Sequence, residues 1–484
     1  MKIQQRPKRF IVIPRHSSPG AATTEGLSVS RMAVARLAGR MAAGTPAAAA
    51  RATRKAGSLV TTPAPVKVVN RSPADGALLL EPRDHVSIDR IKAQAPQGTK
   101  VLEEQWYSLD RPARPWATRS ATLKTPRLRI GRTIDWSVTV VLDDGQRRRL
   151  PDALVTVMTN EDKSIGVEVK TNRYGKAIVT LSDTTESVDA IYVDPLHSGW
   201  PMRVTDVLAI PGGVEIAVVP IDLTVPDVRG TVYGKPEAGA GGSVRVAVVD
   251  TGVGPHTALK IKRGLNTTTA EAAQRFRDED GHGSHVAGVI ASVATGWRRG
   301  EASRVELHAY RIFESGDPYA SSFAIASAIK DAATQGCDLV NLSIGDSMAD
   351  DGIRDAVEFA WARGCVCVAA TGNDGKGRVD YPARYTQAVA VSAIGLIGSW
   401  PAGAYLEWTL STSRGIGSRW GVMSGTSMAT PLATGVLARR LAATQSVTKM
   451  PRDATRSAGI VKLAMQAAED LRLPARAQGK GLAR

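Results

Sequence analysis

The sequence predicts an α/β protein with a doubly wound, mostly parallel sheet, preceded by a small α+β module and a β-sandwich. Apolar, β-branched runs at 244–249 and 365–370, with helix-forming stretches further along the chain, predict buried parallel strands. Residues 126–222 instead alternate apolar and polar side chains in short runs between Asp-Gly, Asn and Gly turns, which is typical of a sandwich. The chain has 484 residues, 43% of them hydrophobic, so several separate cores are expected.

The first 110 residues are expected to form the α+β module. We predict strands at 9–14, 66–69, 76–80 and 100–107, and helices at 27–43 and 85–93. Residues 42–65 are rich in Ala, Thr and Pro and predict a flexible insertion. The remaining boundaries are a linker at 111–125, the sandwich at 126–222, a Pro- and Gly-rich linker at 223–242, the main α/β domain at 243–470 and a basic tail at 471–484.

The formal net charge of +16 is concentrated near the N-terminus, where residues 1–60 contain eleven Lys and Arg and a single acid, Glu25. Apart from Phe10, no aromatic residue is interleaved with these charges, so stacking on nucleic-acid bases is poorly supported and we expect no nucleic-acid partner. A basic segment that complements an acidic cleft is the better interpretation. Nucleic-acid binding would require steeply salt-dependent binding that survives deletion of the main domain.

The three cysteines, Cys337, Cys365 and Cys367, do not suggest a disulfide framework and are expected to be buried core residues. No apolar run is long enough to cross a membrane, and no apolar stretch follows the charges of residues 1–20. An ordinary secretory signal is therefore not visible. We expect an intracellular protein, with leaderless export or a misassigned start as the alternatives.

Three separate segments supply the parts of a serine-nucleophile site. Asp250 follows the predicted strand 244–249, so its carboxylate is expected at the carboxyl edge of the sheet, where ligands of open α/β sheets bind. His282 and Ser427 each stand directly before a predicted helix. Asn373 follows the run 365–370, with Thr371 and Gly372 in between, and provides an amide that can donate to a developing oxyanion. Singly, Asp250 also fits a turn former and Ser427 a helix N-cap.

Residues from about 241 to about 445 resemble the catalytic domain of the subtilisin-like serine proteases. The resemblance rests on five motifs in the family's order: Val249-Asp250-Thr251-Gly252, His282-Gly283-Ser284-His285-Val286-Ala287-Gly288, Asn341-Leu342-Ser343-Ile344-Gly345, Ala370-Thr371-Gly372-Asn373 and Gly425-Thr426-Ser427-Met428-Ala429-Thr430-Pro431. It implies a serine endopeptidase in which Ser427 is the nucleophile, His282 the general base and Asp250 the orienting carboxylate. Asn373 and the Ser427 backbone N–H would then bind the oxyanion.

Two departures from the family pattern are visible. Ser284 stands where Thr is usual, and residues 394–422 lack the recognisable Ala-Pro-Gly segment that the family carries ahead of the nucleophile. The resemblance also implies that Ser343, Ile344 and Gly345 pair with substrate backbone. Residues 369–372, which include Ala370 and Gly372, would form a wall of the pocket for the P1 side chain, the residue before the cleaved bond.

Asp380 would fall near the floor of that P1 pocket. A buried carboxylate there favours Arg or Lys at P1, because the charge otherwise has no partner. The alternative is that Asp380 caps a turn or pairs with Arg378 or Arg384. Asp374 would add negative potential at the pocket rim.

The order of elements in the first 110 residues resembles the inhibitory prodomain of the same protease family, which implies that the protein is a zymogen with its own prodomain as a partner. Arg111, Arg114 and Arg119 are then candidate self-cleavage sites, and an ordinary charged linker is the alternative. The sandwich resembles carboxypeptidase-regulatory or immunoglobulin-like modules, which position partners rather than catalyse.

The resemblance also raises the question of calcium, which is common in the family. Asp278, Glu279 and Asp280 are adjacent acids that point in alternating directions, so we predict a solvated turn and no metal or other cofactor. The function predicted is therefore a serine endopeptidase that acts on protein or peptide substrates through an acyl-enzyme. The alternative is a catalytically silent scaffold of the same fold that binds protein partners through its basic N-terminus and its sandwich.

Overall fold

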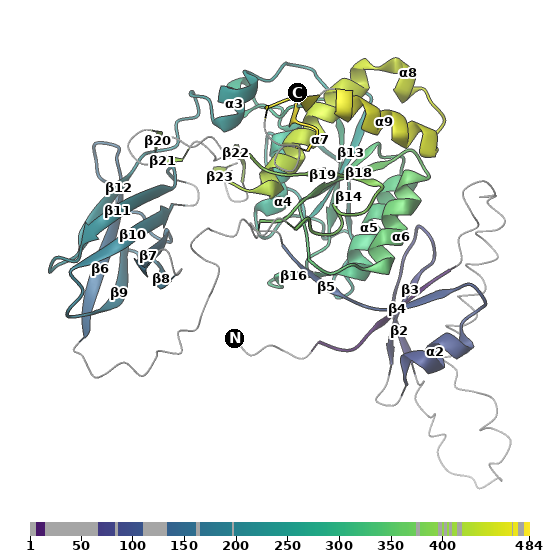
Figure 1. Ribbon diagram of the computed structural model, residues 1–484, viewed down its shortest axis with the longest axis horizontal. Helices are drawn as coiled ribbons and strands as arrows, with labels where there is room; N and C mark the ends of the chain where they lie inside the picture. The colour runs from purple at the N-terminus through teal and green to yellow at the C-terminus, as the bar shows by residue number, and fades with distance from the viewer. Residues whose placement is uncertain are drawn as a thin grey trace, which may run out of the picture.

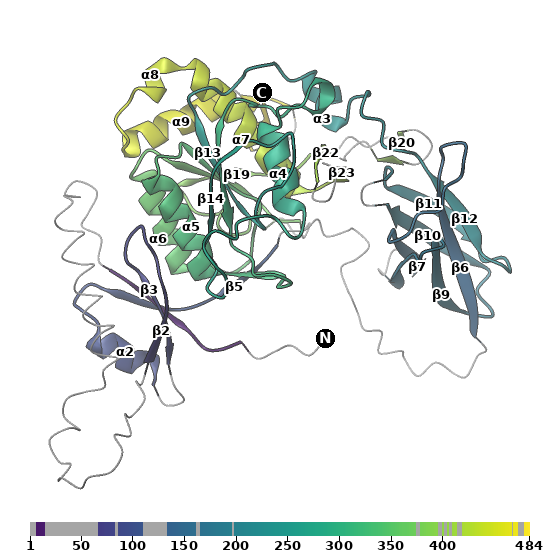
Figure 2. The same cartoon turned by 180° about the vertical axis from the view of Figure 1, so that it is seen from behind.

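The structure of the chain is a computed structural model. It describes residues 6–14, 66–82, 86–109, 133–160, 165–195, 198–373, 378–394, 399–400, 404–405, 409–413, 419–466, 468–472 and 479–484. Figures 1 and 2 show a central α/β domain, with the β-sandwich on one side and the small N-terminal module on the opposite side. The predicted helix at 27–43 and the insertion at 42–65 lie outside the described residues.

A parallel sheet forms the centre of the α/β domain. Its strand order is β14-β15-β13-β17-β18-β19, and each neighbouring pair is parallel. The strands are β13 (Arg245–Asp250), β14 (Ile261–Asn266), β15 (Glu306–Arg311), β17 (Leu339–Leu342), β18 (Val366–Ala370) and β19 (Ala388–Val391). The doubly wound parallel fold predicted from the apolar runs is confirmed.

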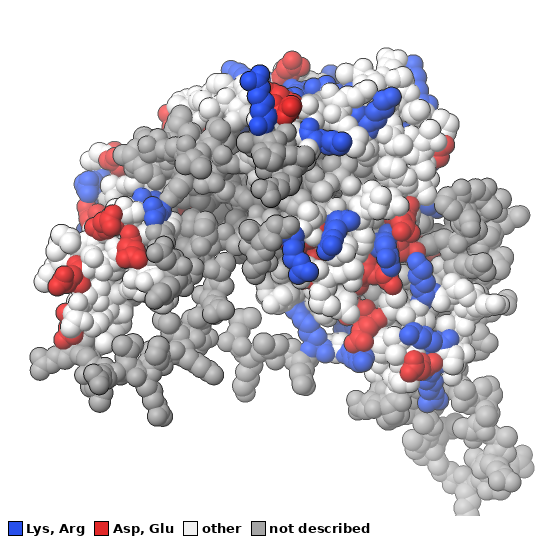
Figure 3. Space-filling model, viewed as in Figure 1, with Lys and Arg blue, Asp and Glu red and all other residues white. Residues whose placement is uncertain are grey.

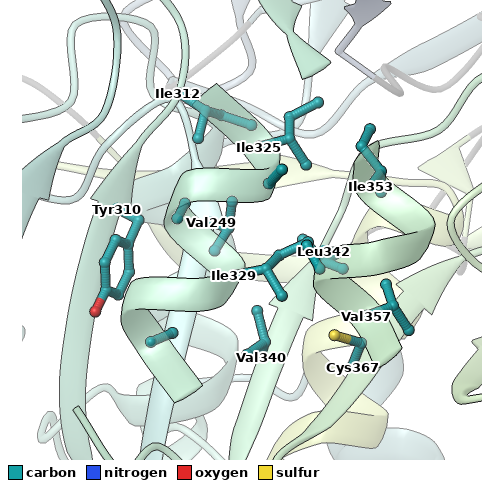
Figure 4. Packing of buried hydrophobic residues seen from close by; sticks show 14 of the residues in the cluster. Val249, Tyr310, Ile312, Ile325, Ile329, Val340, Leu342, Ile353, Val357 and Cys367 are labelled. Carbon is teal, nitrogen blue, oxygen red and sulfur yellow. The ribbon is translucent and has the colours of Figure 1, made fainter. Parts of the chain in front are cut away.

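Helices cover both faces of this sheet. On one face lie α5 (Ser322–Thr334) and α6 (Asp351–Trp361), which begin at N-caps Ser321 and Asp350. Their apolar side chains pack on alternate strand residues such as Val249 and Val340 (Figure 4). The other face is covered by α4 (His282–Ala291), α7 (Thr426–Ala443) and α9 (Ala454–Gln466). Two further short helices are α3 (Val228–Tyr233) and α8 (Gln445–Thr448), with a 3₁₀ turn at Gly296–Arg298.

Residues 133–218 form the predicted β-sandwich. One sheet has the order β11-β10-β7-β8 and the other β12-β6-β9. The strands are β6 (Thr133–Leu142), β7 (Leu154–Asn160), β8 (Ile165–Lys170), β9 (Lys176–Ser182), β10 (Ser187–Asp194), β11 (Met202–Leu208) and β12 (Val214–Val218). Their inward side chains form one core around Trp136, as the period-two alternation predicts. A short pair from the α/β domain, β20 (Ser399–Trp400) and β21 (Ala404–Tyr405), extends the first sheet beside β11.

The N-terminal module is an antiparallel sheet of order β2-β3-β1-β4 with one helix, α2 (Ile88–Gln94). Its strands are β1 (Phe10–Ile13), β2 (Val66–Arg71), β3 (Leu78–Pro82) and β4 (Lys100–Glu103). One face packs on α2 through a cluster that includes Phe10, Leu80 and Ile91. The opposite face packs on Phe323 of α5. The module therefore lies against the α/β domain through the face of its sheet that α2 leaves uncovered.

The predicted last strand at 100–107 is divided into two. After β4, Gln105 exchanges hydrogen bonds with Ser322: its N–H donates to Ser322 Oγ at 3.0 Å, and its carbonyl accepts from the Ser322 N–H at 2.8 Å. These contacts turn the chain away from the module's own sheet. The second piece, β5 (Trp106–Ser108), then pairs with β16 (Tyr319–Ser321) of the α/β domain.

The end of the chain folds back on the α/β domain. A hairpin of β22 (Thr409–Thr412) and β23 (Trp420–Met423) precedes α7. Part of the predicted tail, β25 (Leu482–Ala483), pairs with β24 (Ala468–Glu469), and Arg484 Nη1 donates to the carbonyl of Val232 in α3 at 2.8 Å. Among the helices described, none is long and apolar enough to cross a membrane.

Candidate active site

Asp250 and His282 meet at the carboxyl edge of the sheet. Asp250 is the last residue of β13, and His282 is the first residue of α4. Asp250 Oδ1 lies 2.8 Å from His282 Nδ1 and also accepts a hydrogen bond from the Thr251 N–H at 2.7 Å. The carboxylate is fully buried and His282 is 2% exposed. This contact holds the imidazole with Nδ1 toward Asp250 and Nε2 directed away from it.

A glycine makes this approach of helix to strand possible. A Cβ on Gly283 would lie 2.1 Å from the carbonyl oxygen of Gly252 and 3.0 Å from Asp250 Cβ. No side chain fits in that space. Gly283 is therefore required for the first turn of α4 to reach the Asp250 turn.

Asp278 is a part of the site whose role the sequence did not reveal. Its buried carboxylate accepts hydrogen bonds from Thr251 Oγ1 at 3.0 Å and from the N–H groups of Asp280, Gly281 and Ser284 at 2.9, 2.8 and 2.8 Å. Thr251 Oγ1 in turn accepts from the Gly283 N–H at 2.9 Å. Asp278 thus joins the loop that carries His282 to the turn that carries Asp250. Burial raises the pKa of Asp278.

The structure corrects the prediction that residues 278–280 form a solvated turn, because Asp278 is only 5% exposed. The next acid, Glu279, forms ion pairs with Arg311 at 2.9 Å and Arg275 at 2.8 Å, and its pKa falls to about 2 because of its hydrogen bond with Arg311. Across the described ranges, no group of three or more His, Cys, Asp or Glu side chains is arranged to hold a metal ion. No local pattern in the sequence distinguishes Asp278 from its two acidic neighbours, because its burial depends on the Asp250 turn.

Ser427 lies in the first turn of α7, the helix that packs beside α4. It is fully buried, and its Oγ lies 3.4 Å from the carbonyl oxygen of Ser343. Ser343 Oγ donates to the Ser427 carbonyl at 2.9 Å and is itself bonded to Asn341 Nδ2 at 3.0 Å. The start of α7 is therefore tied to the segment after β17.

Asn373, from the segment after β18, contacts the first residue of α7. Its Oδ1 accepts from the Thr426 N–H at 2.9 Å and from Thr426 Oγ1 at 3.1 Å. Because the amide oxygen is engaged by the residue before Ser427, the amide nitrogen lies on the other side of the side chain. This arrangement presents a donor beside the serine segment.

The predicted substrate-binding residues lie on the two segments that flank this point. Ser343, Ile344 and Gly345 follow β17, and Ala370 ends β18 with Gly372 two residues beyond it. Asp380 is half-buried and lies between the two segments. A Cβ added to Gly345 would lie 3.1 Å from Asp380 Cβ, and a Cβ added to Gly372 would lie 2.3 Å from Asp380 Oδ2. The glycines therefore leave the space that the Asp380 side chain occupies. Asp374 lies outside the described residues.

A second histidine, His285, supports the site from within α4. Its Nε2 lies 2.9 Å from the carbonyl oxygen of Thr409 in β22. Burial, followed by the neighbouring His282, lowers the pKa of His285 to about 3. His285 therefore stays neutral at ordinary pH and serves as a link between α4 and the hairpin.

The chain is similar to known proteins of one family. The sequence profile described as "Subtilase family" matches residues 241–481. M-protease of Shouchella clausii (strain KSM-K16) is 31% identical over 289 residues, which cover 58% of this chain and 73% of that protein. Alkaline elastase YaB of Bacillus sp. (strain YaB) is 32% identical over 273 residues, covering 54% and 68%, and Subtilisin Savinase of Lederbergia lenta is 36% identical over 208 residues, covering 41% and 76%. The chain thus belongs to the subtilase family and is a subtilisin-like serine endopeptidase.

Proposed function

We propose that Asp250, His282 and Ser427 are the catalytic triad of this endopeptidase. The observation that carries the proposal is the buried 2.8 Å contact between Asp250 and His282, at the same sheet edge where α7 begins with Ser427. His282 Nε2 takes the proton of Ser427 Oγ as the oxygen attacks the peptide carbonyl, and later gives it to the leaving amine. Water then attacks the acyl-enzyme, His282 takes its proton, and the acid product leaves as Ser427 is restored.

The oxyanion of each tetrahedral intermediate would be bound by Asn373 Nδ2 and the backbone N–H of Ser427. The engagement of Asn373 Oδ1 by Thr426 supports this orientation. The N-terminus of α7 adds positive potential at the same point. Removal of one such donor typically lowers kcat by about 10²–10³-fold.

Labelling by a fluorophosphonate tests the triad directly. Wild-type protein should be modified at Ser427, and Ser427→Ala should not. The matched control is Ser457→Ala, which removes a buried serine hydroxyl of α9 that donates to the Trp361 carbonyl at 2.8 Å. This control should be labelled like the wild type. Processed enzyme, freed of the N-terminal module, that is folded but not labelled would favour the silent scaffold instead.

We also propose that Asp380 selects Arg or Lys at P1. Its carboxylate lies between Gly345 and Gly372, on the segments that would flank the P1 side chain. Asp380→Asn keeps the shape and removes the charge. The ratio of kcat/KM for Arg-containing over Leu-containing peptides should then fall, and an unchanged ratio would exclude this role.

The N-terminal module is proposed as the inhibitory prodomain. Its β5 lies along β16, and Leu109 forms an antiparallel bridge with Ile344, one of the predicted substrate-binding residues. Leu109 and Tyr107 are 8% and 2% exposed, and both belong to the core cluster that contains Ile344. The chain that leaves the module thus occupies a segment where substrate backbone is expected to pair.

The register supports a position for self-cleavage. Leu109 pairs antiparallel with Ile344, and the carbonyl oxygen of the adjacent Ser343 lies 3.4 Å from Ser427 Oγ. We therefore propose cleavage after Asp110 or Arg111, and the preference proposed for Asp380 selects Arg111. Mass spectrometry of wild type and Ser427→Ala after incubation distinguishes the two bonds. A cut after Arg114 or Arg119 would contradict this register.

A buried ion cluster helps to hold the module in place. Lys330 Nζ of α5 lies 2.6 Å from Asp75 Oδ2 of the module and 2.7 Å from Asp355 Oδ2 of α6. Lys100 of the module reaches Asp355 Oδ1 at 3.1 Å. Figure 3 shows side chains of both charges close together where the module meets α5 and α6. The contact combines this cluster with the apolar packing around Phe323.

A further inference from the structure

The β-sandwich contacts the α/β domain at the hairpin β22–β23. Trp200, in the connection between β10 and β11, forms one buried apolar cluster with Val422 of β23. Val219, Ile221, Leu223 and Trp420 pack against this pair. Trp200 and Val422 are each 5% exposed, and the Trp200 N–H donates to the Val219 carbonyl at 2.8 Å. The base of the sandwich and the hairpin therefore share a core.

The other strand of the hairpin is fixed to the helix that carries His282. The carbonyl oxygen of Thr409 accepts a hydrogen bond from His285 Nε2 at 2.9 Å. Ser411 Oγ donates to the His285 carbonyl at 2.8 Å, and Thr412 Oγ1 donates to the Ser284 carbonyl at 2.6 Å. Three hydrogen bonds therefore hold the first turns of α4 against the strand β22.

The hairpin also leads directly to the proposed nucleophile. β23 ends at Met423, and α7 begins at Thr426 immediately before Ser427. Trp420, at the start of β23, packs edge-on against His256 with 5.1 Å between ring centroids. His256 Nε2 lies 3.0 Å from the carbonyl oxygen of Arg419. The position of the hairpin thus affects both the His282 helix and the start of α7.

We propose that the β-sandwich positions the active site by bracing the hairpin β22–β23, with Trp200 as the positioning residue. The inference rests on the proposed triad of Asp250, His282 and Ser427. The sandwich acts through packing and touches no reacting atom. Its role is to hold the hairpin so that α4 and α7 present His282 and Ser427 in the geometry that acylation requires.

The buried state of Trp200 favours this role over a substrate-collecting module. The sandwich surface nearest the α/β domain is occupied by the hairpin, so that surface is not open to a substrate. Catalytic groups need support from packed neighbours, and a misplacement of about 1 Å lowers rates by about 10²-fold. A loosened hairpin is therefore expected to affect the chemical step more than substrate binding.

Trp200→Ala tests the proposal in the full chain. The side chain that fills the shared core is removed, and we expect kcat to fall about 10-fold or more, since loss of geometry acts on the reacting groups. KM should change by less than about threefold, because the proposed substrate-binding residues are retained. The rate of Ser427 labelling by a fluorophosphonate, compared with wild type after processing of both proteins, should fall in parallel with kcat. The matched control is Tyr174→Ala, which removes a 57% exposed aromatic residue between β8 and β9.

Two further variants keep the test decisive if Trp200→Ala folds poorly. Val422→Ala removes the partner from the hairpin side, and Trp200→Phe keeps an aromatic ring and should restore most of the labelling rate. If the shared contact is the route of the effect, the double variant Trp200→Ala/Val422→Ala should be no slower than the slower single variant. If the rate reductions of the two single variants multiply in the double variant, the proposal is overturned.

The outcomes also separate this inference from the proposed function. Processed wild-type enzyme that is folded but not labelled would contradict the proposed triad. Labelled wild type, with variants that have a lower Tm but an unchanged kcat well below that Tm, would show that Trp200 serves stability alone and would overturn the bracing role. A lower kcat together with a lower labelling rate and an unchanged KM supports it, because the brace acts on the geometry of the reacting groups.

Discussion

The Asp75→Asn substitution is the sharpest test of how the N-terminal module is held. Asp75 is fully buried and contacts Lys330, which is itself 2% exposed. Asparagine keeps the oxygen that accepts from the Ala77 N–H at 3.0 Å, so the local turn is retained. With that oxygen kept, the amide nitrogen takes the place of Asp75 Oδ2 beside Lys330 Nζ, so the variant removes both the charge and the acceptor from the contact.

The expected magnitude follows from burial. Removal of one partner from a buried ion pair typically costs 3–5 kcal/mol, and Lys330 keeps Asp355 as its second partner, so we take the lower end of about 3 kcal/mol. Because about 1.4 kcal/mol corresponds to a tenfold change, the docked state should be weakened by about 150-fold. When the module detaches, Asp75 and Lys330 both regain water, so the cost falls on the docked state.

Labelling of the intact chain by a fluorophosphonate measures this change. The reagent needs an open cleft, so its rate reports the fraction of molecules in which the module is detached. Asp75→Asn should label far faster than wild type, up to the rate of the fully open enzyme. Glu103→Gln is the control, because the Lys8–Glu103 pair is exposed at 3.5 Å and contributes at most about 1 kcal/mol.

Equal labelling rates for Asp75→Asn, Glu103→Gln and wild type would refute this reasoning. That result would mean that the ion cluster is replaced by water without cost, or that the module does not cover the site. Phe323→Ala then separates the two explanations, since it tests the apolar part of the same contact.

Three further predictions concern the contact between the N-terminal module and the α/β domain, and the candidate active site. Phe323→Ala removes a 2% exposed ring that packs on the module's sheet, and the loss of such a ring from a core costs about 3–5 kcal/mol. Labelling of the intact chain should therefore accelerate, while kcat of the processed enzyme stays constant. An unchanged labelling rate would argue against docking through this face. Asp278→Ala leaves the donors of Thr251, Gly281 and Ser284 without their acceptor, and each unsatisfied buried donor costs about 1–3 kcal/mol of stability. Both Tm and kcat should therefore fall. A lower Tm with wild-type kcat would limit Asp278 to a structural role. Docking of the module should weaken in acid. Burial alone raises the pKa of Asp75, but the Lys330 ammonium and hydrogen bonds outweigh burial and leave that pKa lowered, so the stabilisation is present above about pH 4 and is lost as pH falls through the lowered pKa. A pH series of labelling rates on the intact chain, with Asp75→Asn as the reference, measures this loss.

Local signals in the sequence were sufficient for the main sheet and for the elements that carry the candidate site. The run 244–249 predicts β13 because β-branched residues suit a strand that is buried on both faces, and Asp250 then ends it. The short apolar segments after His282 and Ser427 likewise predict α4 and α7. In these elements the side chains that form the core are close together in sequence, so their pattern is visible without the fold.

Contacts between distant residues account for what the sequence did not reveal. The strand predicted at 100–107 is broken because Gln105 bonds to Ser322, more than two hundred positions later. The Asp278 carboxylate is indistinguishable in sequence from a solvated acid, since its burial depends on the Asp250 turn. The attachment of Trp200 to Val422 likewise follows from no local pattern.

The reciprocal hydrogen bonds between Gln105 and Ser322, together with Phe323, have a consequence for how the protein opens. The first turn of α5 is completed by a residue of the N-terminal module, and the module's sheet is completed by a residue of α5. Segments that complete one another open and close as one cooperative unit. Amide hydrogen exchange should therefore show β1, β4 and the start of α5 losing protection together, whereas the distant strands of the β-sandwich exchange at a rate of their own.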